Sequence, residues 1–281
     1  MEEVSVIVCV KNSETTIERC LQSIARNHPA EILVVDGNSH DRTLEIAQRY
    51  TNKIILDGGK GLAYARQLGA ELSQGNHVMY IDSDVELPKD DTIANLLRDL
   101  KERKWNAIHA TVVDPREDIS FWEQGEDLYW QYRVTKAGEK DILPTLCCLI
   151  EKSLVLENKF DPFFTGAVED SDFFFRIRRL GHTFGCSSEE VYHYHRATLH
   201  EFLKQKVWFG KGNANFFWKH RKPIILFVPA LLVLDGAQFC VRSKKINLLP
   251  YFFLWSLAYS WGFLVGLQEL VINVERKEIA F

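Results

Sequence analysis

The sequence predicts an α/β fold, a mainly parallel sheet with helices on both of its faces. Short apolar runs of strand length alternate with segments of helical periodicity through the first half of the chain, which is the pattern of βαβ units. At 281 residues, with 46% hydrophobic and 26% charged residues, the chain has the length of one globular domain, or of one domain with an appendage. Sheets of this kind bind ligands along the edge where their strands end.

Strands and helices are expected to alternate up to residue 113. The strands fall at residues 5–10, 31–35, 54–56, 78–81 and 107–113, and the helices at 15–27, 41–50, 62–72 and 91–102. The first helix places Ile17, Leu21 and Ile24 on one face, as a helix packed on a sheet requires. This alternation predicts parallel strands joined by crossover helices.

Charge and cysteine content narrow the class of protein. A net charge of -4 argues against a nucleic-acid-binding protein. The six cysteines sit mostly in apolar runs with no C-x-x-C pair, which predicts reduced core thiols in a cytosolic protein. The first residues, Met1 to Val4, lead directly into a strand pattern, so no signal peptide is expected.

The most informative motif runs from Val78 to Asp84, an apolar strand that ends on Asp82 and Asp84 with Ser83 between them. Two carboxylates this close repel each other, so a bound divalent cation is the simplest explanation of the pair. Oxygen ligands that leave several positions open suit Mg²⁺ or Mn²⁺ bridging to a diphosphate. The alternative is a solvated, Asp-rich turn in which Asp84 caps the next helix.

Polar groups also follow the first two strands. Lys11 and Asn12 follow the first strand, and Asp36 ends the second, where a carboxylate is able to accept hydrogen bonds from a base or a ribose. The alternative for Asp36 is an Asx motif that stabilises its own turn. Asp41 is expected to cap the helix that it opens.

A glycine-rich turn, Gly58-Gly59-Lys60-Gly61, precedes the third helix. The free backbone amides of this turn, with Lys60 and Arg66, are suited to bind phosphate. The turn lacks the spacing of a P-loop or of the G-x-G-x-x-G fingerprint, so it is a weaker signal than either.

A second group of carboxylates, Glu169, Asp170 and Asp172, precedes a helix expected at residues 173–180. Acidic residues near a helix N-terminus are favoured by the macrodipole, but three are more than capping needs. A carboxylate beside a metal-bound diphosphate sugar is able to deprotonate an acceptor hydroxyl, and the neighbouring phenylalanines would keep such a base partly dry. The segment therefore supplies a candidate general base.

Taken together, these motifs resemble the family 2 glycosyltransferases, which are inverting enzymes of the GT-A fold. The resemblance covers roughly residues 4–215. It is carried by the ordered combination of Val4–Val8 with Asn12, Cys20–Ile24, Glu31–Gly37 with Ser39, Asp41 and Thr43, Asp82–Asp84, and Glu169-Asp170 with Asp172 and Arg176.

The resemblance implies a role for each candidate residue. Asp36 contacts the nucleotide base, Asp84 with Asp82 holds the metal and the donor diphosphate, and Asp170, beside Glu169, is the general base. The acceptor oxygen attacks the anomeric carbon in a single in-line displacement, which inverts its configuration. His193 is a further candidate metal ligand, although a histidine in a Tyr-rich strand is as often structural. The remaining donor-side residues are Lys11, Asn12, Lys60, Gly61, Arg66 and Ser83.

The C-terminal part of the chain predicts membrane contact. Residues 198–222 mix basic with aromatic side chains, as expected of amphipathic interface helices. Two apolar runs follow at 224–241 and 248–268, each close to the ~20 residues of a membrane-spanning helix. They predict a hydrophobic hairpin, transmembrane or re-entrant; the alternative is a soluble hairpin packed on the enzyme or across a dimer. The expected domains are a catalytic domain at 1–197, interface helices at 198–222 and the hairpin at 223–281.

This arrangement resembles a reduced form of the cellulose-synthase-like subgroup, which has a Q-x-x-R-W motif near the acceptor site. The closest stretch here is Gln205-Lys206-Val207-Trp208-Phe209, with Trp208 where the motif has Arg. This departure, and the small number of apolar helices, disfavour processive polymer synthesis. The resemblance places Gly166, Gln205 and Trp208 on the acceptor side.

The sequence therefore predicts a membrane-associated hexosyltransferase with its catalytic domain in the cytoplasm and Mg²⁺ or Mn²⁺ as cofactor. The expected donor is GDP-mannose or a UDP-hexose, with a slight preference for the former, and the expected acceptor is lipid-linked or membrane-proximal. A dolichyl- or polyprenyl-phosphate hexose synthase stays open as an alternative, since a phosphate acceptor is already ionised and needs no base. A nucleotidyltransferase would need a triphosphate-binding loop that Val10 to Ser13 does not form, and intact Asp82, Asp84 and Asp170 disfavour a non-catalytic scaffold.

Overall fold

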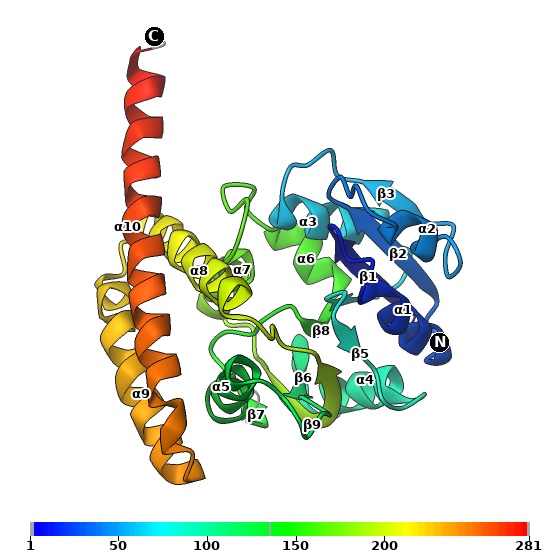
Figure 1. The fold of residues 1–281 in the computed structure, drawn as a ribbon. Coiled ribbons are helices and arrows are strands. Elements are labelled where there is room, and N and C mark those ends of the chain that lie inside the picture. Colours follow the sequence, from blue (N-terminus) through cyan, green and yellow to red (C-terminus); the bar gives the residue numbers. More distant parts are fainter. Residues whose placement is uncertain (1–2, 135, 280–281) are drawn as a thin grey trace. The chain divides into compact units, whose positions relative to one another are not determined.

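The computed structural model describes residues 3–134 and 136–279, with side chains as far as residue 272 (Figure 1). The chain divides into two compact units. The sheet unit comprises the residues up to Pro115, Arg133–Thr165 and Glu169–Tyr194. The helical unit comprises Arg116–Tyr132, Gly166–Val168 and the chain from His195 onward. The division after Tyr194 lies near the predicted end of the catalytic domain at residue 197, but the helical unit also takes two segments from within that predicted domain.

The sheet unit is built on one nine-stranded sheet with the order β3-β2-β1-β4-β8-β6-β9-β5, in which β7 pairs with β9. The strands β1, β2, β3 and β4 pair in parallel, and β9 is parallel to β6. Antiparallel pairing joins β8 to β4 and β6, and β9 to β5 and β7. The strands are β1 Val4–Val10, β2 Glu31–Asp36, β3 Ile54–Leu56, β4 His77–Ile81, β5 Val85–Glu86, β6 Ala107–Val113, β7 Gly138–Glu139, β8 Cys147–Glu151 and β9 Phe184–His193.

The helices of the sheet unit are α1 Ile17–Arg26, α2 Thr43–Ala47, α3 Leu62–Leu72, α4 Thr92–Arg103, α6 Lys152–Asn158 and α7 Glu169–Arg179. The predicted α/β fold is confirmed, and the sheet is mixed because the chain adds antiparallel strands after β6. Two predicted helices have different limits. The helix expected at 41–50 is the single short α2, and the helix expected at 173–180 begins four residues earlier, so that Glu169, Asp170 and Asp172 lie in its first turn.

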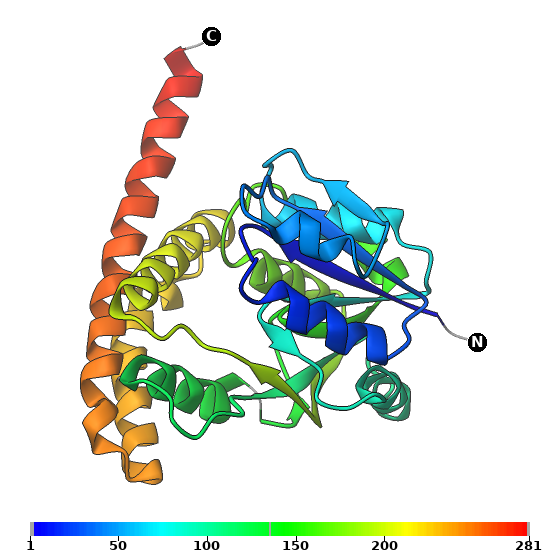
Figure 2. The same cartoon turned by 45° about the vertical axis from the view of Figure 1, so that its right-hand side comes forward.

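Helices cover both faces of the sheet (Figure 2). One face packs against α3, α6 and α7, and its core includes Ile7, Val35, Tyr80 and Phe173. The other face packs against α1 and α4, and α1 contributes the predicted Ile17, Leu21 and Ile24, all fully buried. Alternate side chains of each buried strand therefore enter opposite cores, which explains why these strands read as continuous apolar runs.

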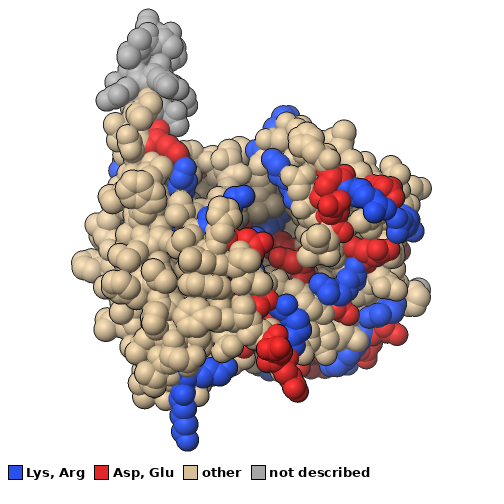
Figure 3. Space-filling view, in the orientation of Figure 1, with Lys and Arg blue, Asp and Glu red and all other residues tan. Residues whose placement is uncertain are grey.

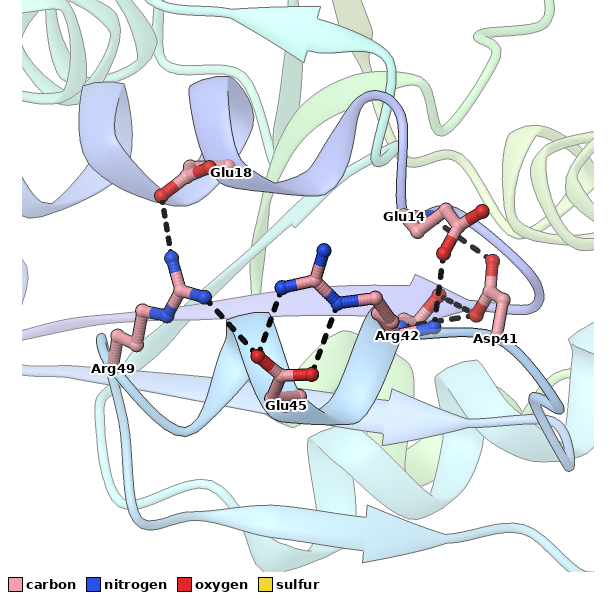
Figure 4. A network of polar contacts seen from close by, with 7 residues as sticks. Glu14, Glu18, Asp41, Arg42, Glu45 and Arg49 are labelled. Atoms are coloured by element: carbon pink, nitrogen blue, oxygen red, sulfur yellow. Dashed lines mark hydrogen bonds and ion pairs between the residues drawn. The ribbon is translucent and has the colours of Figure 1, made fainter.

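Surface ion pairs tie α1 to α2 in the sheet unit (Figure 4). Arg49 lies 3.0 Å from Glu18 and 3.4 Å from Glu45, and Arg42 binds Glu45 through two nitrogens at 3.0 Å each. Asp41 accepts hydrogen bonds from the backbone N–H groups of Thr43 and of Glu14, at 3.0 and 3.1 Å. The predicted cap at Asp41 is not formed as such, since α2 begins at Thr43 with Arg42 at its N-cap; Asp41 instead binds the first N–H of α2 and holds the loop after β1.

The helical unit contains α5 Phe121–Tyr129, α8 Leu199–His220, α9 Val228–Ser243 and α10 Leu249–Ile279, with the short helices η1 Trp130–Val134, η2 Pro223–Phe227 and η3 Ile246–Leu248. The basic and aromatic stretch at 198–222 is one helix, α8, that begins with a capping box between Thr198 and Glu201. The hairpin expected after it is formed by α9 and α10. By length and composition, Pro223–Ser243 and Ile246–Ile272 are each able to cross a membrane.

A buried ion pair lies at the centre of the helical unit. The Lys206 Nζ of α8 binds the Glu126 carboxylate of α5 and lies 3.8 Å from the ring centroid of Trp255 in α10. Tyr251 donates a hydrogen bond of 2.5 Å to the same carboxylate. Although burial opposes ionisation, Lys206, His195 and Tyr251 outweigh it and lower the pKa of Glu126 to about 2. Lys206 is fully buried, so it does not belong to the exposed basic face that the sequence predicts for this helix.

The close approach of α3 to β1 gives the first testable prediction. A Cβ on Gly69 would lie 2.6 Å from the Cγ2 of Ile7, so Gly69→Ala should lower the free energy of unfolding by ~1–3 kcal/mol. The loss should appear in urea unfolding despite the higher helix propensity of alanine. Leu72→Ala, an exposed position of the same helix, is the control and should change stability by about 0.5 kcal/mol or less. Equal effects of the two substitutions would contradict the packing.

Candidate functional site

The candidate donor residues lie at one edge of the sheet, because β1, β2 and β4 are parallel neighbours that end together. Val10 pairs with Asp36, and Ile7 pairs with Tyr80, so the loops after these three strands start at similar heights. The hydroxyl of Ser83 lies 3.0 Å from that of Ser13 and joins the loop after β4 to the loop after β1. Lys11 is exposed in the same loop.

Hydrogen bonds fasten the loop after β1 to the loop after β2. The N–H of Asn12 donates to the Ser39 hydroxyl at 2.9 Å, and the N–H of His40 donates to the Asn12 side chain at 2.9 Å. Asp36 is 1% exposed, and both carboxylate oxygens accept from the N–H of Ser39, at 3.0 and 3.3 Å. The sequence left two alternatives for Asp36, an Asx-type turn and contact with the nucleotide base. The hydrogen bonds of Asp36 in the structure are those of the turn.

Arg66 joins the two acidic motifs. Its Nη2 donates a hydrogen bond of 3.2 Å to the Oδ1 of Asp82, and its Nη1 forms an ion pair with Glu169. The side chains of Arg66 and Glu169 are 4% and 3% exposed, whereas that of Asp82 is 40% exposed. The sequence predicts that Arg66 meets a donor phosphate. In the structure its charge is instead directed to two carboxylates, and it lies too deep to be an open phosphate ligand.

Asp84 faces the last residue of β9. The Nε2 of His193 lies 3.5 Å from the Oδ2 of Asp84, and the N–H of Tyr194 donates to the carbonyl of Asp84 at 3.3 Å. The pairing of β5 with β9 holds these residues together, since Val85 lies opposite His193. Asp84 and His193 thus lie close together, as predicted, and their approach depends on the pairing of β5 with β9, which the sequence did not predict.

Asp170, in the first turn of α7, accepts hydrogen bonds from neighbouring backbone. The N–H of Thr145 donates to its Oδ2 at 3.3 Å and the N–H of Ser171 to its Oδ1 at 2.6 Å. The next residue of the same loop, Leu146, accepts a 2.9 Å hydrogen bond from the N–H of Asp82. The two residues before β8 therefore connect the predicted base to the predicted metal ligands, and nothing in the sequence marks Thr145 for this role.

The pKa of the Asp82 carboxyl is affected by several of these groups. Burial raises the pKa of the Asp82 carboxyl, and Asp84 and Asp170 raise it further. Arg66 and His193 oppose that shift by lowering the pKa. The net shift of the Asp82 pKa is upward, with burial as its largest cause, and the carboxylates of Asp82, Asp84 and Asp170 outnumber the guanidinium of Arg66.

A divalent cation fits this excess of negative charge. Among residues 3–134 and 136–272, no group of three or more His, Cys, Asp and Glu side chains is placed to hold a metal ion. Asp84 and His193 converge, and Asp82 has one oxygen directed to Arg66. Such a partial donor set suits an ion that takes its remaining ligands from a diphosphate and water.

The glycine-rich turn lies against the segment that leads toward the acidic pair. Gly61 has a φ of +98°, and a Cβ there would lie 2.5 Å from the carbonyl oxygen of Thr165. Only glycine fits this combination of backbone conformation and contact. Lys60 stays exposed, with its Nζ 3.3 Å from the hydroxyl of Tyr64. Lys60 and the free N–H groups at the start of α3 are thus available to an anion.

The three predicted acceptor-side residues lie in the helical unit. A Cβ on Gly166 would lie 2.7 Å from the Nε1 of Trp208, so the indole packs directly on the Gly166 backbone. Gln205 accepts a hydrogen bond of 3.0 Å from the Nζ of Lys206. Gly212 makes a similarly close approach to the carbonyl of Ala167. One face of α8 therefore holds the Gly166–Val168 segment, which directly precedes Glu169 in the chain.

A cavity of about 750 Å³ lies elsewhere in the sheet unit, lined by residues that include Gln74, His77, Trp105 and Lys152. His77 begins β4 and Lys152 follows β8, so the cavity opens at the edge of the sheet opposite the aspartates. Its position separates it from the carboxylate cluster. We assign it no role in donor binding.

The fold and the carboxylates at its strand ends define the class of protein, an α/β transferase with the layout of GT-A glycosyltransferases. The family model described as glycosyl transferase family 2 matches residues 5–156, more than half of the chain. The chain therefore belongs to glycosyltransferase family 2, as the motifs predict, and is a glycosyltransferase.

Solved structures share this architecture. A mannosyltransferase from Pyrobaculum calidifontis, in complex with GDP-Man and Mn²⁺, matches with a TM-score of 0.68 and 17% identity, over 95% of this chain and 88% of that one. Glucosyl-3-phosphoglycerate synthase from Mycobacterium tuberculosis, in complex with Mg²⁺ and UDP, matches with a TM-score of 0.57 and 18% identity, over 79% of this chain and 80% of that one. These likenesses confirm the GT-A form of the predicted fold.

Sequence relatives agree on the class. A cholesterol galactosyltransferase from Borreliella burgdorferi is 35% identical over 89 residues, which are 29% of this chain and 25% of that protein. The match thus spans about a quarter of the length of the relative.

The bridge made by Arg66 gives a second prediction. Arg66→Met would leave Glu169 buried without its cation, so the free energy of unfolding should fall by ~3–5 kcal/mol. Adding Glu169→Leu should recover part of the loss, because the second change removes the unpaired charge. Arg49→Met is the matched control, since its ion pairs with Glu18 and Glu45 are exposed (Figure 4) and are worth about 1 kcal/mol or less. Urea unfolding that gives Arg66→Met and Arg49→Met the same loss would contradict the bridge.

Proposed function

We propose that this glycosyltransferase moves a hexose from GDP-mannose or a UDP-hexose, with inversion, to a lipid-linked or membrane-proximal acceptor. The observation that carries the proposal is the meeting of Asp82, Asp84 and Asp170 around one point, beside Arg66 and His193. The nucleotide sugars in two structural neighbours and the sterol acceptor named for one sequence relative support the donor and acceptor classes. The slight preference for a mannosyl donor rests on the structural neighbour that is in complex with GDP-Man.

The donor side would use the loops at the sheet edge. Asn12 and Asp36 shape the loops that would meet the base and ribose, and Lys11, Lys60 and the turn at Gly61 supply positive charge and N–H groups for the diphosphate. Ser83 holds the loop after β4 against the loop after β1. The role of Arg66 is then to keep Asp82 and Glu169 in place rather than to bind the donor.

Asp84, Asp82 and His193 are the residues that would hold Mg²⁺ or Mn²⁺. When bound, the cation would offset the charge of the leaving nucleoside diphosphate. These three side chains would provide only part of the ligands of the ion. The diphosphate of the sugar nucleotide would be needed to complete its coordination. Metal affinity should therefore depend strongly on the presence of nucleotide.

Asp170 would act as the general base. The carboxylate takes the proton of the acceptor hydroxyl while the acceptor oxygen forms its bond to the anomeric carbon and the bond to the diphosphate oxygen breaks. The hydrogen bonds from Thr145 and Ser171 fix the carboxylate, and Glu169, buried with Arg66, orients the turn that carries it. Gly166, Gln205 and Trp208 keep the acceptor-side roles that the resemblance predicts for them.

The exposed apolar surface of α9 and α10 supports membrane association of the enzyme. Both helices have the length and composition of membrane segments. An acceptor with a lipid anchor would then diffuse in the same surface as the enzyme. The catalytic domain is proposed to lie on the cytoplasmic side.

Removal of Asp84 tests metal-dependent donor binding. Asp84→Ala should abolish the metal-dependent part of GDP and UDP binding measured by calorimetry, because the ion loses the carboxylate that lies beside His193. The substitution should leave thermal unfolding nearly unchanged, since Asp84 packs little at the sheet edge. Asp90→Ala, on an exposed loop, is the control. Nucleotide affinity that is the same with and without chelator in the wild-type chain would contradict the proposal.

Replacement of Asp170 separates catalysis from binding. Asp170→Asn keeps the size of the side chain but cannot accept the proton, so transfer should fall by ~10² to 10⁴-fold while donor affinity barely changes. Asp90→Asn is the matched control and should transfer at the wild-type rate. Loss of donor and metal binding would instead assign Asp170 to the donor shell. If neither binding nor transfer changes, an acceptor that is already ionised, such as a polyprenyl phosphate, is indicated.

A further inference from the structure

One face of α10 is apolar and exposed. Phe253, Leu257, Trp261 and Leu264 are 53–64% exposed and follow one another along a single stripe of the helix. Exposed apolar residues of η2 and α9 accompany them: Ile224, Leu226, Phe227, Leu231, Leu234 and Val241. In Figure 3 the middle of the hairpin surface is almost free of charged atoms, and charged atoms appear toward its two ends.

The opposite face of α10 is covered by α5 and α8 along most of its length. Near its start, Tyr251 and Trp255 contact the buried pair Glu126 and Lys206. Near its middle, a Cβ on Gly262 would lie 2.1 Å from the carbonyl oxygen of Val207, so the backbones of α8 and α10 touch.

The contact with α8 continues toward the end of the described side chains of α10. Gly266 packs against the Lys211 backbone, and Lys211 itself reaches Glu269 at 2.6 Å. Both members of this ion pair are partly exposed, with side chains 37% and 55% exposed. Charged groups therefore flank α10 at both ends of its covered face.

The length of this covered face argues against an upright helix. From Tyr251 to Glu269, α10 rises by about 27 Å at ~1.5 Å per residue, which is close to the ~30 Å hydrocarbon thickness of a bilayer. If α10 crossed the bilayer upright, α8 would lie beside it throughout the hydrocarbon layer. The exposed Lys204 and Glu201 of α8 and the Lys211–Glu269 pair would then sit in lipid, which membranes disfavour strongly.

Basic residues at the two ends of α9 also argue against a hairpin that spans the membrane. Lys219, Arg221 and Lys222 precede the hairpin, and Arg242, Lys244 and Lys245 lie at its turn. A spanning hairpin would put these two clusters on opposite sides of the membrane, against the tendency of Lys and Arg to stay on the cytoplasmic side. A hairpin that lies flat puts both clusters at the level of the lipid headgroups on one side.

We infer that the α9–α10 hairpin lies in the plane of the membrane and inserts its exposed apolar stripe into one leaflet, without crossing the bilayer. The two basic clusters then meet anionic headgroups, and the face that carries α5 and α8 stays out of the hydrocarbon. This inference rests on the proposed membrane association and specifies its geometry. The partner is one leaflet of a phospholipid bilayer that contains anionic lipid.

Cysteine labelling tests the topology on the full chain. Asn247→Cys places an exposed thiol in the turn of the hairpin, and Glu102→Cys places one on the sheet unit. Both variants, and the parent chain as background, are expressed in bacterial cells, and their membranes are prepared as inverted and as right-side-out vesicles. An impermeant maleimide added outside should label both cysteines in inverted vesicles and neither in right-side-out vesicles.

The other labelling results separate the inference from the proposed function. If Glu102→Cys is labelled only in inverted vesicles and Asn247→Cys only in right-side-out vesicles, the hairpin spans the bilayer. That result would overturn the inference but keep membrane association. Recovery of the unaltered chain in the soluble fraction without detergent would overturn both.

A second measurement identifies the occupant of the apolar stripe. Leu257→Glu with Trp261→Glu should lower partitioning onto phosphatidylcholine vesicles that contain phosphatidylglycerol by about tenfold or more, since two exposed apolar side chains lose their burial in lipid. Leu180→Glu, at an equally exposed leucine of the sheet unit, should leave partitioning unchanged. A double variant that keeps vesicle binding but changes from dimer to monomer would overturn the inference, because the stripe would then face a second copy of the chain.

Discussion

The site of this glycosyltransferase depends on one buried guanidinium. Arg66 binds both Asp82, at the end of β4, and Glu169, at the start of α7, and these two segments lie 87 residues apart in the chain. Without a cation between them, their carboxylates would repel each other inside a poorly hydrated part of the sheet unit. Since Asp84 follows Asp82 and Asp170 follows Glu169, the position of the proposed metal ligand and that of the proposed base are both set by the same side chain. Arg66 thereby couples the segment that carries the proposed metal ligands to the segment that carries the proposed base.

The remaining charge imbalance explains why the site suits a nucleotide sugar together with a metal ion. Arg66 supplies one positive charge to a cluster that includes Asp82, Asp84, Glu169 and Asp170, and burial, with Asp84 and Asp170, raises the pKa of Asp82. The neighbouring thiols add no charge at neutral pH, since burial raises the pKa of Cys9 to about 12 and also raises that of Cys20. A cation therefore gains from this field, but its protein ligands are too few to hold it in a closed cage. In the proposed reaction the diphosphate that would complete the coordination of the cation is also the leaving group, so metal binding and donor binding would stabilise each other.

The sequence was sufficient to predict the first half of the sheet and the identity of the carboxylates, because local signals decide both. An apolar run that ends in polar residues marks a strand end, and the parallel order of β1, β2 and β4 follows from alternation with helices. Long-range pairing was not predictable in the same way: β8 is a five-residue strand whose antiparallel place between β4 and β6 brings Thr145 to Asp170, and β9 brings His193 to Asp84. The partners of Arg66 were also missed, since a basic residue one turn after a glycine-rich loop has the same sequence context whether it faces a phosphate or a buried carboxylate.

In the helical unit, too, the sequence context of a basic residue did not reveal its buried partner. Lys206 lies within a run of basic and aromatic residues, which predicts an exposed interfacial face, yet it is fully buried against Glu126 and Trp255. Because the pair satisfies both charges away from water, one side of α10 is committed to protein contacts, and only its other side is left for lipid. A hydropathy average over α10 cannot distinguish these two sides, since it counts buried Tyr251 and Phe252 together with exposed Leu257 and Leu264. Length and composition therefore measure only the capacity of a helix to cross a membrane, while the protein contacts of α10 determine which of its faces remains exposed.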